Sequence, residues 1–175
     1  MFIVVTGGSG SGKSFYAEGQ ITQLADPARF YLATMQCYDD ETRKRIDRHR
    51  KMRAGKGFVT VERPLNLKDL TVPEHEGTCS VLLECMSNLA ANEMFDPAGS
   101  GEDAYEALRQ GIDSLLAQCD NLVVVTNEVF SDGVRYDPST VKYIELMGRI
   151  NRYMAEKADR FTEVVYGIPV NLARD

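Results

Sequence analysis

The sequence predicts a protein of the α/β class, in which helices flank a mostly parallel sheet. The first observation is a series of strand-length apolar runs, at 2–6, 30–34, 80–85, 121–128 and 162–167. These runs are apolar almost throughout, as is typical of parallel strands that are buried on both faces. The second observation is that stretches with a helical pattern alternate with them, near 13–25, 39–53, 102–119 and 138–159. Such alternation favours an α/β fold.

The elements can be followed in order along the chain. The first strand, FIVVT, runs into a glycine-rich segment, after which KSFYAEGQITQLA has the pattern of a helix. The second strand, FYLAT, precedes a strongly charged helical stretch and the alternating, strand-like VTVE. SVLLEC and NLVVVTNE are the next apolar strands, with a helical stretch between them. After TEVVYG, the tail IPVNLARD could form a closing edge strand.

Length and composition are those of a globular protein of one domain, which we expect to cover residues 1–175. The net charge of −6 argues against general nucleic-acid binding. No apolar stretch approaches the roughly 20 residues that span a bilayer, and the opening strand has no basic leader, so no signal peptide is expected. The four cysteines contain no C-x-x-C pair, which favours reduced thiols in a cytoplasmic protein over disulfides or zinc.

The segment TGGSGSGKS, at 6–14, has the spacing of a phosphate-binding loop, with Gly7, Gly12, Lys13 and Ser14 at the fixed positions. Its glycines let the backbone curl so that several N–H groups point at a phosphate. Lys13 supplies a cation for the terminal phosphates, and the Ser14 hydroxyl can ligate Mg²⁺. A flexible glycine turn is the alternative, but the flanking strand and helix favour a site for a nucleoside triphosphate.

A basic segment stands out in this acidic chain. Residues 43–56 hold eight of the twenty Lys and Arg residues, and also His49, one of two histidines. On a helix, Arg45, His49 and Arg53 share one face. Nearby cations lower the pKa of a histidine, which leaves it neutral and able to attack phosphorus, while the arginines hold an anionic substrate. The alternative is an ordinary solvated helix face.

Three carboxylates are candidates for metal binding or for orienting a nucleophile. In α/β folds, ligands collect at the carboxyl ends of the strands. Glu84 and Glu128 each end an apolar strand, and an acid there often holds Mg²⁺ beside a phosphate loop. The alternative for both is an acid placed at a helix N-terminus. Glu62 follows a strand-like stretch, where plain solvent exposure is the stronger alternative.

The chain resembles the bifunctional adenosylcobinamide kinase/adenosylcobinamide-phosphate guanylyltransferase family of bacterial cobalamin synthesis. The matching segments run in order along most of the chain: TGGSGSGKS, YLAT, RIDRHRKMR, TVERP, LLEC, VVVTNEV, GRINR and VVYGIPV. The phosphate loop alone is shared by countless proteins, whereas the histidine-arginine segment followed by TVE, LLEC and TNEV is far more specific. The resemblance implies a P-loop NTPase with a RecA-like sheet, and a homotrimer.

The resemblance also implies two reactions. A nucleoside triphosphate, ATP or GTP, phosphorylates adenosylcobinamide, and a histidine, here His49, then takes GMP from GTP and passes it to adenosylcobinamide phosphate. With Lys13 and Glu84, His49 would form the catalytic set, and Ser14 and Glu84 would hold Mg²⁺. The family's nucleotide contacts carry over to Gly7, Gly8, Ser9, Gly10, Ser11, Gly12, Lys13, Ser14, Ala33, Thr34, Met35, Arg50, Lys51, Met52, Arg53, Glu62 and Glu84.

The chain departs from many relatives at two places. It has Phe58 where many carry tryptophan, and Phe130 where many have the glycine of NEVG. Both changes concern the expected corrinoid-facing loop more than the nucleotide chemistry. Three other functions stay open: a P-loop kinase for another small alcohol without guanylyl transfer, a GTPase-type switch, and a nucleotide-binding module without chemistry. The switch is disfavoured because no N-K-x-D motif is present.

Overall fold

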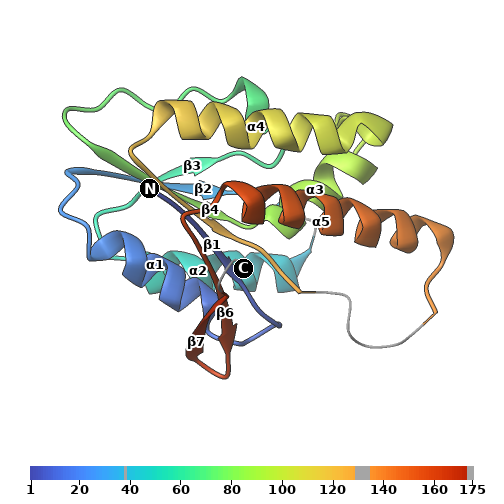
Figure 1. The fold of residues 1–175 in the computed structure, drawn as a ribbon, viewed down its shortest axis with the longest axis horizontal. Coiled ribbons are helices and arrows are strands. Elements are labelled where there is room, and N and C mark those ends of the chain that lie inside the picture. Colours follow the sequence, from blue (N-terminus) through green and yellow to red (C-terminus); the bar gives the residue numbers. More distant parts are fainter. Residues whose placement is uncertain (38, 129–134, 173–175) are drawn as a thin grey trace.

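The computed structural model describes residues 1–37, 39–128 and 135–172. A seven-stranded sheet lies at its centre, with the strand order β3-β2-β4-β5-β1-β6-β7 (Figure 1). The strands are β1 (Phe2–Thr6), β2 (Ala28–Ala33), β3 (Val59–Glu62), β4 (Cys79–Glu84), β5 (Asn121–Val125), β6 (Arg160–Val165) and β7 (Ile168–Leu172). Every pair is parallel except β6 with β7. The mostly parallel sheet is therefore confirmed, and the closing edge strand is found as well.

Helices cover both faces of the sheet. They are α1 (Lys13–Thr22), α2 (Asp40–Arg53), α3 (Met86–Phe95), α4 (Ala104–Gln118) and α5 (Pro138–Lys157), with short 3₁₀ turns at Leu67–Asp69 and Gly101–Asp103. The helices α3, α4 and α5 lie on one face, and α1 and α2 lie on the other (Figure 1). The sequence did not predict α3. Its residues follow β4 with only Cys85 between them, so no polar loop marks where the strand ends.

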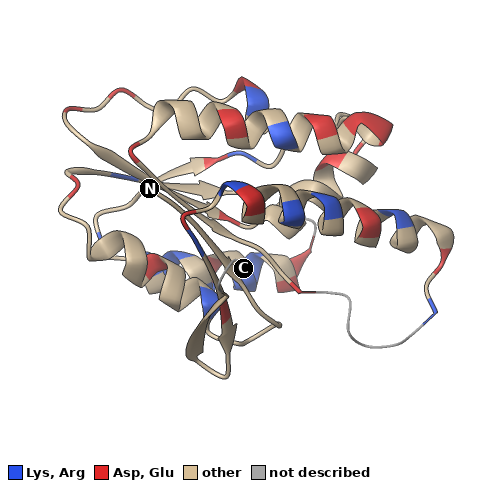
Figure 2. Cartoon of the chain, in the orientation of Figure 1, with Lys and Arg blue, Asp and Glu red and all other residues tan. Residues whose placement is uncertain are grey.

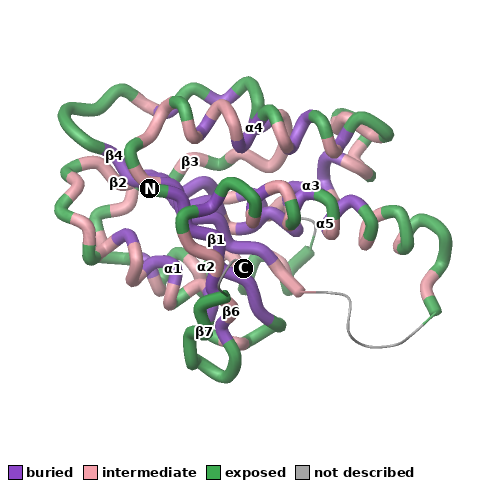
Figure 3. Tube along the Cα trace, viewed as in Figure 1, coloured by how far each residue is buried: buried purple, intermediate pink, exposed green. Residues whose placement is uncertain are grey.

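The strands divide their side chains between two apolar clusters. In β1, Phe2 and Val4 pack with α3, α4 and α5, whereas Ile3 and Val5 pack with α1. This alternation follows from the strand period of two residues. The central strands are buried and β7 is exposed (Figure 3). Charged residues gather on helices and loops instead of on the central strands (Figure 2). Among the described residues, no helix has the length and apolar content needed to cross a membrane.

Helix α2 owes little to apolar packing, because Arg53 is its only buried residue. Its ends are stabilised electrostatically. The Asp39 side chain caps the first turn by accepting a hydrogen bond from the Thr42 backbone N–H at 2.7 Å. Acidic residues occupy the first turn and basic residues the last, as the helix dipole favours. The helix therefore forms a charged cover whose position depends on a few polar contacts.

Candidate nucleotide site

The phosphate loop connects β1 to α1 and is closely packed against the sheet. Gly7 has a φ of +149°, and a Cβ there would lie 2.5 Å from the Val164 carbonyl oxygen, so no other residue fits. Gly12, with a φ of +91°, is the N-cap of α1 and provides no side-chain cap. The first N–H groups of the helix are thus free for an anion. Lys13 is buried, and its Nζ donates to the Gly8 carbonyl oxygen at 3.0 Å.

The loop is linked to the neighbouring strand edge by one side-chain contact. Ser14 Oγ donates a hydrogen bond of 2.7 Å to Glu84 Oε1. Glu84 is the last residue of β4, and in the sheet register it pairs with Ala33, which in turn pairs with Glu62 of β3. Three adjacent strands therefore end at the same level beside the phosphate loop. This is the edge at which α/β folds bind ligands.

Burial changes the acid chemistry of Glu84. Desolvation raises the pKa of its carboxyl to about 7, against the opposing effects of the Ser14 hydrogen bond and the Lys13 charge. The second oxygen, Oε2, is buried and has no hydrogen-bond partner within the described part of the chain. An enclosed carboxylate oxygen without a partner is costly. Glu84 is therefore an acid whose charge requires an additional positive partner.

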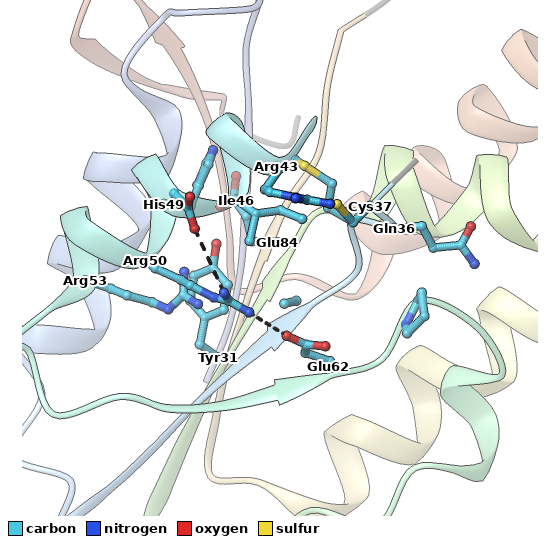
Figure 4. Close-up of a pocket in the computed structure, with 14 residues that line it drawn as sticks. Tyr31, Gln36, Cys37, Arg43, Ile46, His49, Arg50, Arg53, Glu62 and Glu84 are labelled. Atoms are coloured by element: carbon cyan, nitrogen blue, oxygen red, sulfur yellow. Dashed lines mark hydrogen bonds and ion pairs between the residues drawn. The ribbon is translucent and has the colours of Figure 1, made fainter. Parts of the chain in front are cut away.

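A cavity of about 640 Å³ lies between α2 and the carboxyl ends of β2, β3 and β4 (Figure 4). Its lining includes apolar residues from the strands and charged residues from the helix. The lining residues are Tyr31, Ala33, Met35, Gln36, Cys37, Arg43, Ile46, Asp47, His49, Arg50, Arg53, Glu62, Pro64 and Glu84. The cavity thus combines flat apolar walls with cations, which suits a base and its phosphates.

Arginines fix α2 over this cavity. Arg53 is buried, its guanidinium lies 4.1 Å from the centre of the Tyr31 ring, and its Nε donates to Thr60 Oγ1 at 3.2 Å. Arg50 pairs with Glu62 at 2.8 Å across the cavity and lies 4.0 Å from Asp47 on its own helix (Figure 4). The last turn of α2 is therefore bound to both β2 and β3.

His49 lies beside these two arginines and lines the cavity (Figure 4). It is half-buried, and its Nδ1 is enclosed without a hydrogen-bond partner in the residues that the structure describes. Burial is the main cause of the lowered pKa of His49. The charge of Glu18 opposes this effect, while Arg53, Arg45 and Arg48 add to it. The expected direction is thus confirmed, but desolvation and not the arginines is its first cause.

Not all of the residues carried over from the family resemblance meet at the cavity. Those that line it are Ala33, Met35, His49, Arg50, Arg53, Glu62 and Glu84. Thr34 is buried behind it, where its hydroxyl bonds to the Cys85 backbone at 2.7 and 2.8 Å. Lys51 and Met52 line a separate shallow hollow on the outer side of α2. Phe58 packs edge-on against Tyr31, 6.1 Å between ring centres. Phe130 lies outside the described residues.

Three contributors were missed by sequence reasoning. Tyr31 supports Arg53, Glu18 of α1 is fully buried, and Lys56 forms an ion pair with Glu18. For Glu18 a signal existed, because it follows Ser14 by four residues and so shares its helix face. The Glu128 backbone N–H donates to the Gly7 carbonyl oxygen at 3.5 Å, which places this residue beside the phosphate loop.

The described residues offer some, but not all, of the oxygen ligands that a magnesium ion needs. Among residues 1–37, 39–128 and 135–172, no three His, Cys, Asp or Glu side chains form a metal cluster. Mg²⁺ is often held by one or two protein oxygens together with substrate phosphates and water. Ser14 Oγ and the unpartnered Glu84 Oε2 offer such oxygens beside the phosphate loop. The donor set is therefore compatible with Mg²⁺ that arrives with a nucleotide.

The fold and the loop define a P-loop nucleotide-binding protein of the α/β class. One solved ATPase domain superimposes with a TM-score of 0.50 at 10% identity, covering 93% of this chain and 68% of that one. A prototypical ATPase from the type III secretion system of pathogenic bacteria gives 0.51 at 9% identity, covering 97% and 56%. At such low identity these likenesses show the fold alone, and they confirm its class.

Sequence comparison is more specific. The family model described as cobinamide kinase / cobinamide phosphate guanyltransferase matches residues 3–172. The bifunctional adenosylcobalamin biosynthesis protein CobU of Escherichia coli K12 is 36% identical over 98% of this chain and 99% of its own length. Its namesake from Salmonella typhimurium LT2 is 33% identical over the same shares. The chain belongs to the cobinamide kinase/cobinamide phosphate guanyltransferase family, which confirms the resemblance.

Proposed function

We propose that the chain phosphorylates adenosylcobinamide with a nucleoside triphosphate, ATP or GTP, and then transfers GMP from GTP through His49 to give adenosylcobinamide-GDP. The observation that supports this most directly is the placement of His49. It lies on α2 and lines a cavity that Glu84 also lines, and Glu84 is hydrogen bonded to Ser14 beside the phosphate loop. One nucleotide-binding edge thus adjoins both a phosphate cradle and a histidine with a lowered pKa.

In the kinase step, the protein positions the nucleotide phosphates and neutralises their negative charge. The loop from Gly7 to Ser14 directs backbone N–H groups at the phosphates. Lys13 offsets negative charge on the β- and γ-phosphate oxygens as the γ-phosphoryl group moves to the hydroxyl of adenosylcobinamide. No covalent enzyme intermediate is needed for such a transfer. Ser14 and Glu84 would hold Mg²⁺, which would supply further charge neutralisation at the phosphates.

In the guanylyl step, His49 is the nucleophile. Its Nδ1 is enclosed, so Nε2 is the ring nitrogen that faces a ligand. The Nε2 lone pair forms a bond to the α-phosphorus of GTP, and the bond from that phosphorus to the bridging oxygen breaks. Pyrophosphate leaves with the electron pair. The hydroxyl-borne phosphate of adenosylcobinamide phosphate then displaces His49, and Arg50 and Arg53 offset the charge on the α-phosphate.

The decisive experiment looks for the covalent intermediate. The protein is incubated with α-labelled GTP and Mg²⁺, denatured, and tested for label that is acid-labile and base-stable, as a phosphoramidate is. Mass spectrometry should place one GMP on His49. In His49→Ala the adduct and adenosylcobinamide-GDP should both be absent, while phosphorylation of adenosylcobinamide persists. A GMP adduct on another residue refutes the assignment, and a folded variant that has lost both reactions refutes the division of labour.

Three further properties are proposals of the same kind. We expect residues 1–175 to work as one nucleotide-binding domain, in the cytoplasm, where four cysteines outside disulfides stay reduced. We also expect a homotrimer. Exposed apolar side chains on the β6–β7 hairpin, Tyr166 and Ile168 foremost, offer a surface that another copy can cover. Light scattering on the purified protein measures the assembly.

A further inference from the structure

Glu18 is a fully buried carboxylate on α1 that the proposed mechanism does not use. Its side chain has no exposed surface, and Oε2 accepts a hydrogen bond from Lys56 Nζ, just beyond the end of α2. Glu18 follows Ser14 on the same helix face, which turns toward the sheet edge at Glu84. A carboxylate is seldom enclosed so completely without a specific partner.

One of the two oxygens of this carboxylate has no hydrogen-bond partner among the described residues. Glu18 Oε1 is buried and lacks a hydrogen bond within the described chain, and the same holds for His49 Nδ1. Lys56, which holds Glu18, donates from its backbone N–H to the Arg53 carbonyl oxygen at 3.1 Å, so Glu18 lies against the end of α2, one turn beyond His49. The charge of Glu18 also acts on the His49 ring. One is a strong acceptor, and the other becomes a donor when it carries the ring proton. Two enclosed and complementary atoms of this kind are unsatisfied together.

We propose that Glu18 is a positioning residue for His49, whose Nδ1–H donates to Glu18 Oε1 in the reacting complex. The proposal rests on His49 being the guanylylated residue. Lys56 holds one carboxylate oxygen and leaves the other for the histidine, so the pair Lys56–Glu18 works as a fixed support. Carboxylate–histidine pairs commonly fix the tautomer and orientation of a reacting imidazole.

The chemical consequence is specific. A hydrogen bond from Nδ1–H keeps the lone pair on Nε2, which is the nitrogen that attacks. As the P–N bond forms, the ring gains positive charge, the Nδ1 proton stays on the ring, and the carboxylate stabilises that charge. Pyrophosphate takes the electrons of the bond that breaks. When GMP leaves for the acceptor phosphate, the same ring returns to its neutral form.

Charges on several elements surround His49 and must be considered together. Glu18 and Lys56 approach from α1 and from the segment after α2, and Glu84 and Glu62 lie at the ends of β4 and β3. On α2 itself the charged residues nearby are Arg43, Arg45, Asp47, Arg48, Arg50 and Arg53. Among the main influences on the pKa of His49, Glu18 raises it while burial and three arginines lower it, so removing this negative charge should lower that pKa.

The test uses Glu18→Gln in the full chain, with GTP and Mg²⁺. The rate of GMP-adduct formation, measured at a pH above the acid limb, should fall about 10- to 100-fold, as it does for carboxylates that orient a metal-bound histidine. When this rate is plotted against pH, the acid limb of the profile should at the same time move to lower pH. A residue with a purely structural role would lower the rate without moving the limb in that direction. An unchanged rate, or a limb that stays in place or moves up, overturns the proposal.

Two matched variants separate this role from the loss of the ion pair. Lys56→Gln breaks the same pair but keeps the carboxylate, so its acid limb should not move to lower pH. A downward move equal to that of Glu18→Gln would overturn the proposal. The double variant Glu18→Gln/Lys56→Gln buries no unpaired charge and should therefore fold even if a single variant does not. Its acid limb should move to lower pH, as in Glu18→Gln. Phosphorylation of adenosylcobinamide reports the fold of each variant. If the unmodified protein forms no adduct on His49, the proposed function fails. If the adduct forms but its rate and pH dependence are the same in Glu18→Gln, only this inference fails.

Discussion

Ser14 Oγ donates a 2.7 Å hydrogen bond to Glu84 Oε1, although the two residues are 70 positions apart in the sequence. This contact joins the first turn of α1, which follows the phosphate loop, to the end of β4, which lines the cavity under α2. A nucleotide whose phosphates reach Ser14 therefore also lies next to Glu84. The two proposed reactions share this edge of the sheet.

Glu84→Gln should lower the Mg²⁺-dependent rate of phosphorylation more than it lowers nucleotide affinity. The amide keeps the shape of the side chain and can still accept from Ser14, but it loses the charge that would hold the metal. Steady-state rates across a Mg²⁺ titration, together with nucleotide binding measured by calorimetry, separate the two effects. Unchanged rates at saturating Mg²⁺ would show that Glu84 is structural.

The same substitution should stabilise the ligand-free protein at high pH. The pKa of Glu84 is raised from 4.5 to about 7 by burial, so the native state keeps its proton longer than the unfolded state does. Stability is therefore lost as the pH rises between these two values and stays low above them. We expect Glu84→Gln to gain about 1 to 3 kcal/mol over the parent near pH 8, and little near pH 4. Urea unfolding at the two pH values measures this, and an equal difference at both would contradict the shifted pKa.

Lys13→Ala should reduce phosphorylation of adenosylcobinamide by about 10²- to 10³-fold. Lys13 is buried beside the loop and bonded to Gly8, so it is already placed where the phosphates would bind. The matched control is Lys68→Ala, which removes the same charge from an exposed position far along the chain. Single-turnover assays with labelled ATP compare the two variants. Near-normal transfer by Lys13→Ala would refute the phosphate-loop assignment.

The pKa of His49 should lie below 6.5 in the ligand-free protein, because burial and the neighbouring arginines disfavour its charged form. The chain has only two histidines, so the proton resonances of both rings can be followed by NMR during a pH titration. His49→Gln removes one resonance and thereby assigns the other. A titration midpoint above 6.5 for His49 would mean that a nearby carboxylate outweighs burial.

Arg53→Lys should weaken both the fold and guanylylation, although the charge is kept. Lysine cannot reproduce the planar stack on Tyr31 together with the bond from Nε to Thr60, and we expect a loss of about 1 to 2 kcal/mol. Arg48→Lys, on the exposed side of the same helix, is the control and should stay within about 0.5 kcal/mol. Thermal unfolding and adduct formation are measured for both. Equal effects of the two changes would show that Arg53 has no special position.

The architecture could be predicted because its signals are local. Apolar runs and the glycine spacing lie within short windows. The strand predicted at 2–6 is β1, and the run at 121–128 contains β5, which ends at Val125. Helix α3 was missed because only Cys85 separates it from β4, so no loop marks the change from strand to helix. The pattern of one strand passing directly into a helix has no turn residue to reveal it.

The candidate site was predicted less completely than the fold. His49 stands out in a charge cluster, and it lines one cavity together with Arg50 and Arg53, whereas Arg45 is exposed and does not. Glu18, by contrast, is one acid within an ordinary helix, and only tertiary packing buries it beside Lys56. The same holds for the stack of Arg53 on Tyr31, which joins a helix to a strand. Contacts between distant segments leave no trace in local composition.

The position of β1 has a consequence for how the chain acquires its nucleotide site during synthesis. β1 lies between β5 and β6, and the Gly167 N–H of the last hairpin donates to the Ser11 carbonyl oxygen of the phosphate loop at 2.8 Å. The loop is thus translated early, whereas both neighbours of its strand and its hairpin support are translated late. Until then FIVVT emerges from the ribosome as an unpaired apolar segment, open to chaperones and to aggregation. A nascent chain halted before β6 should therefore be unable to retain nucleotide, however complete its glycine motif.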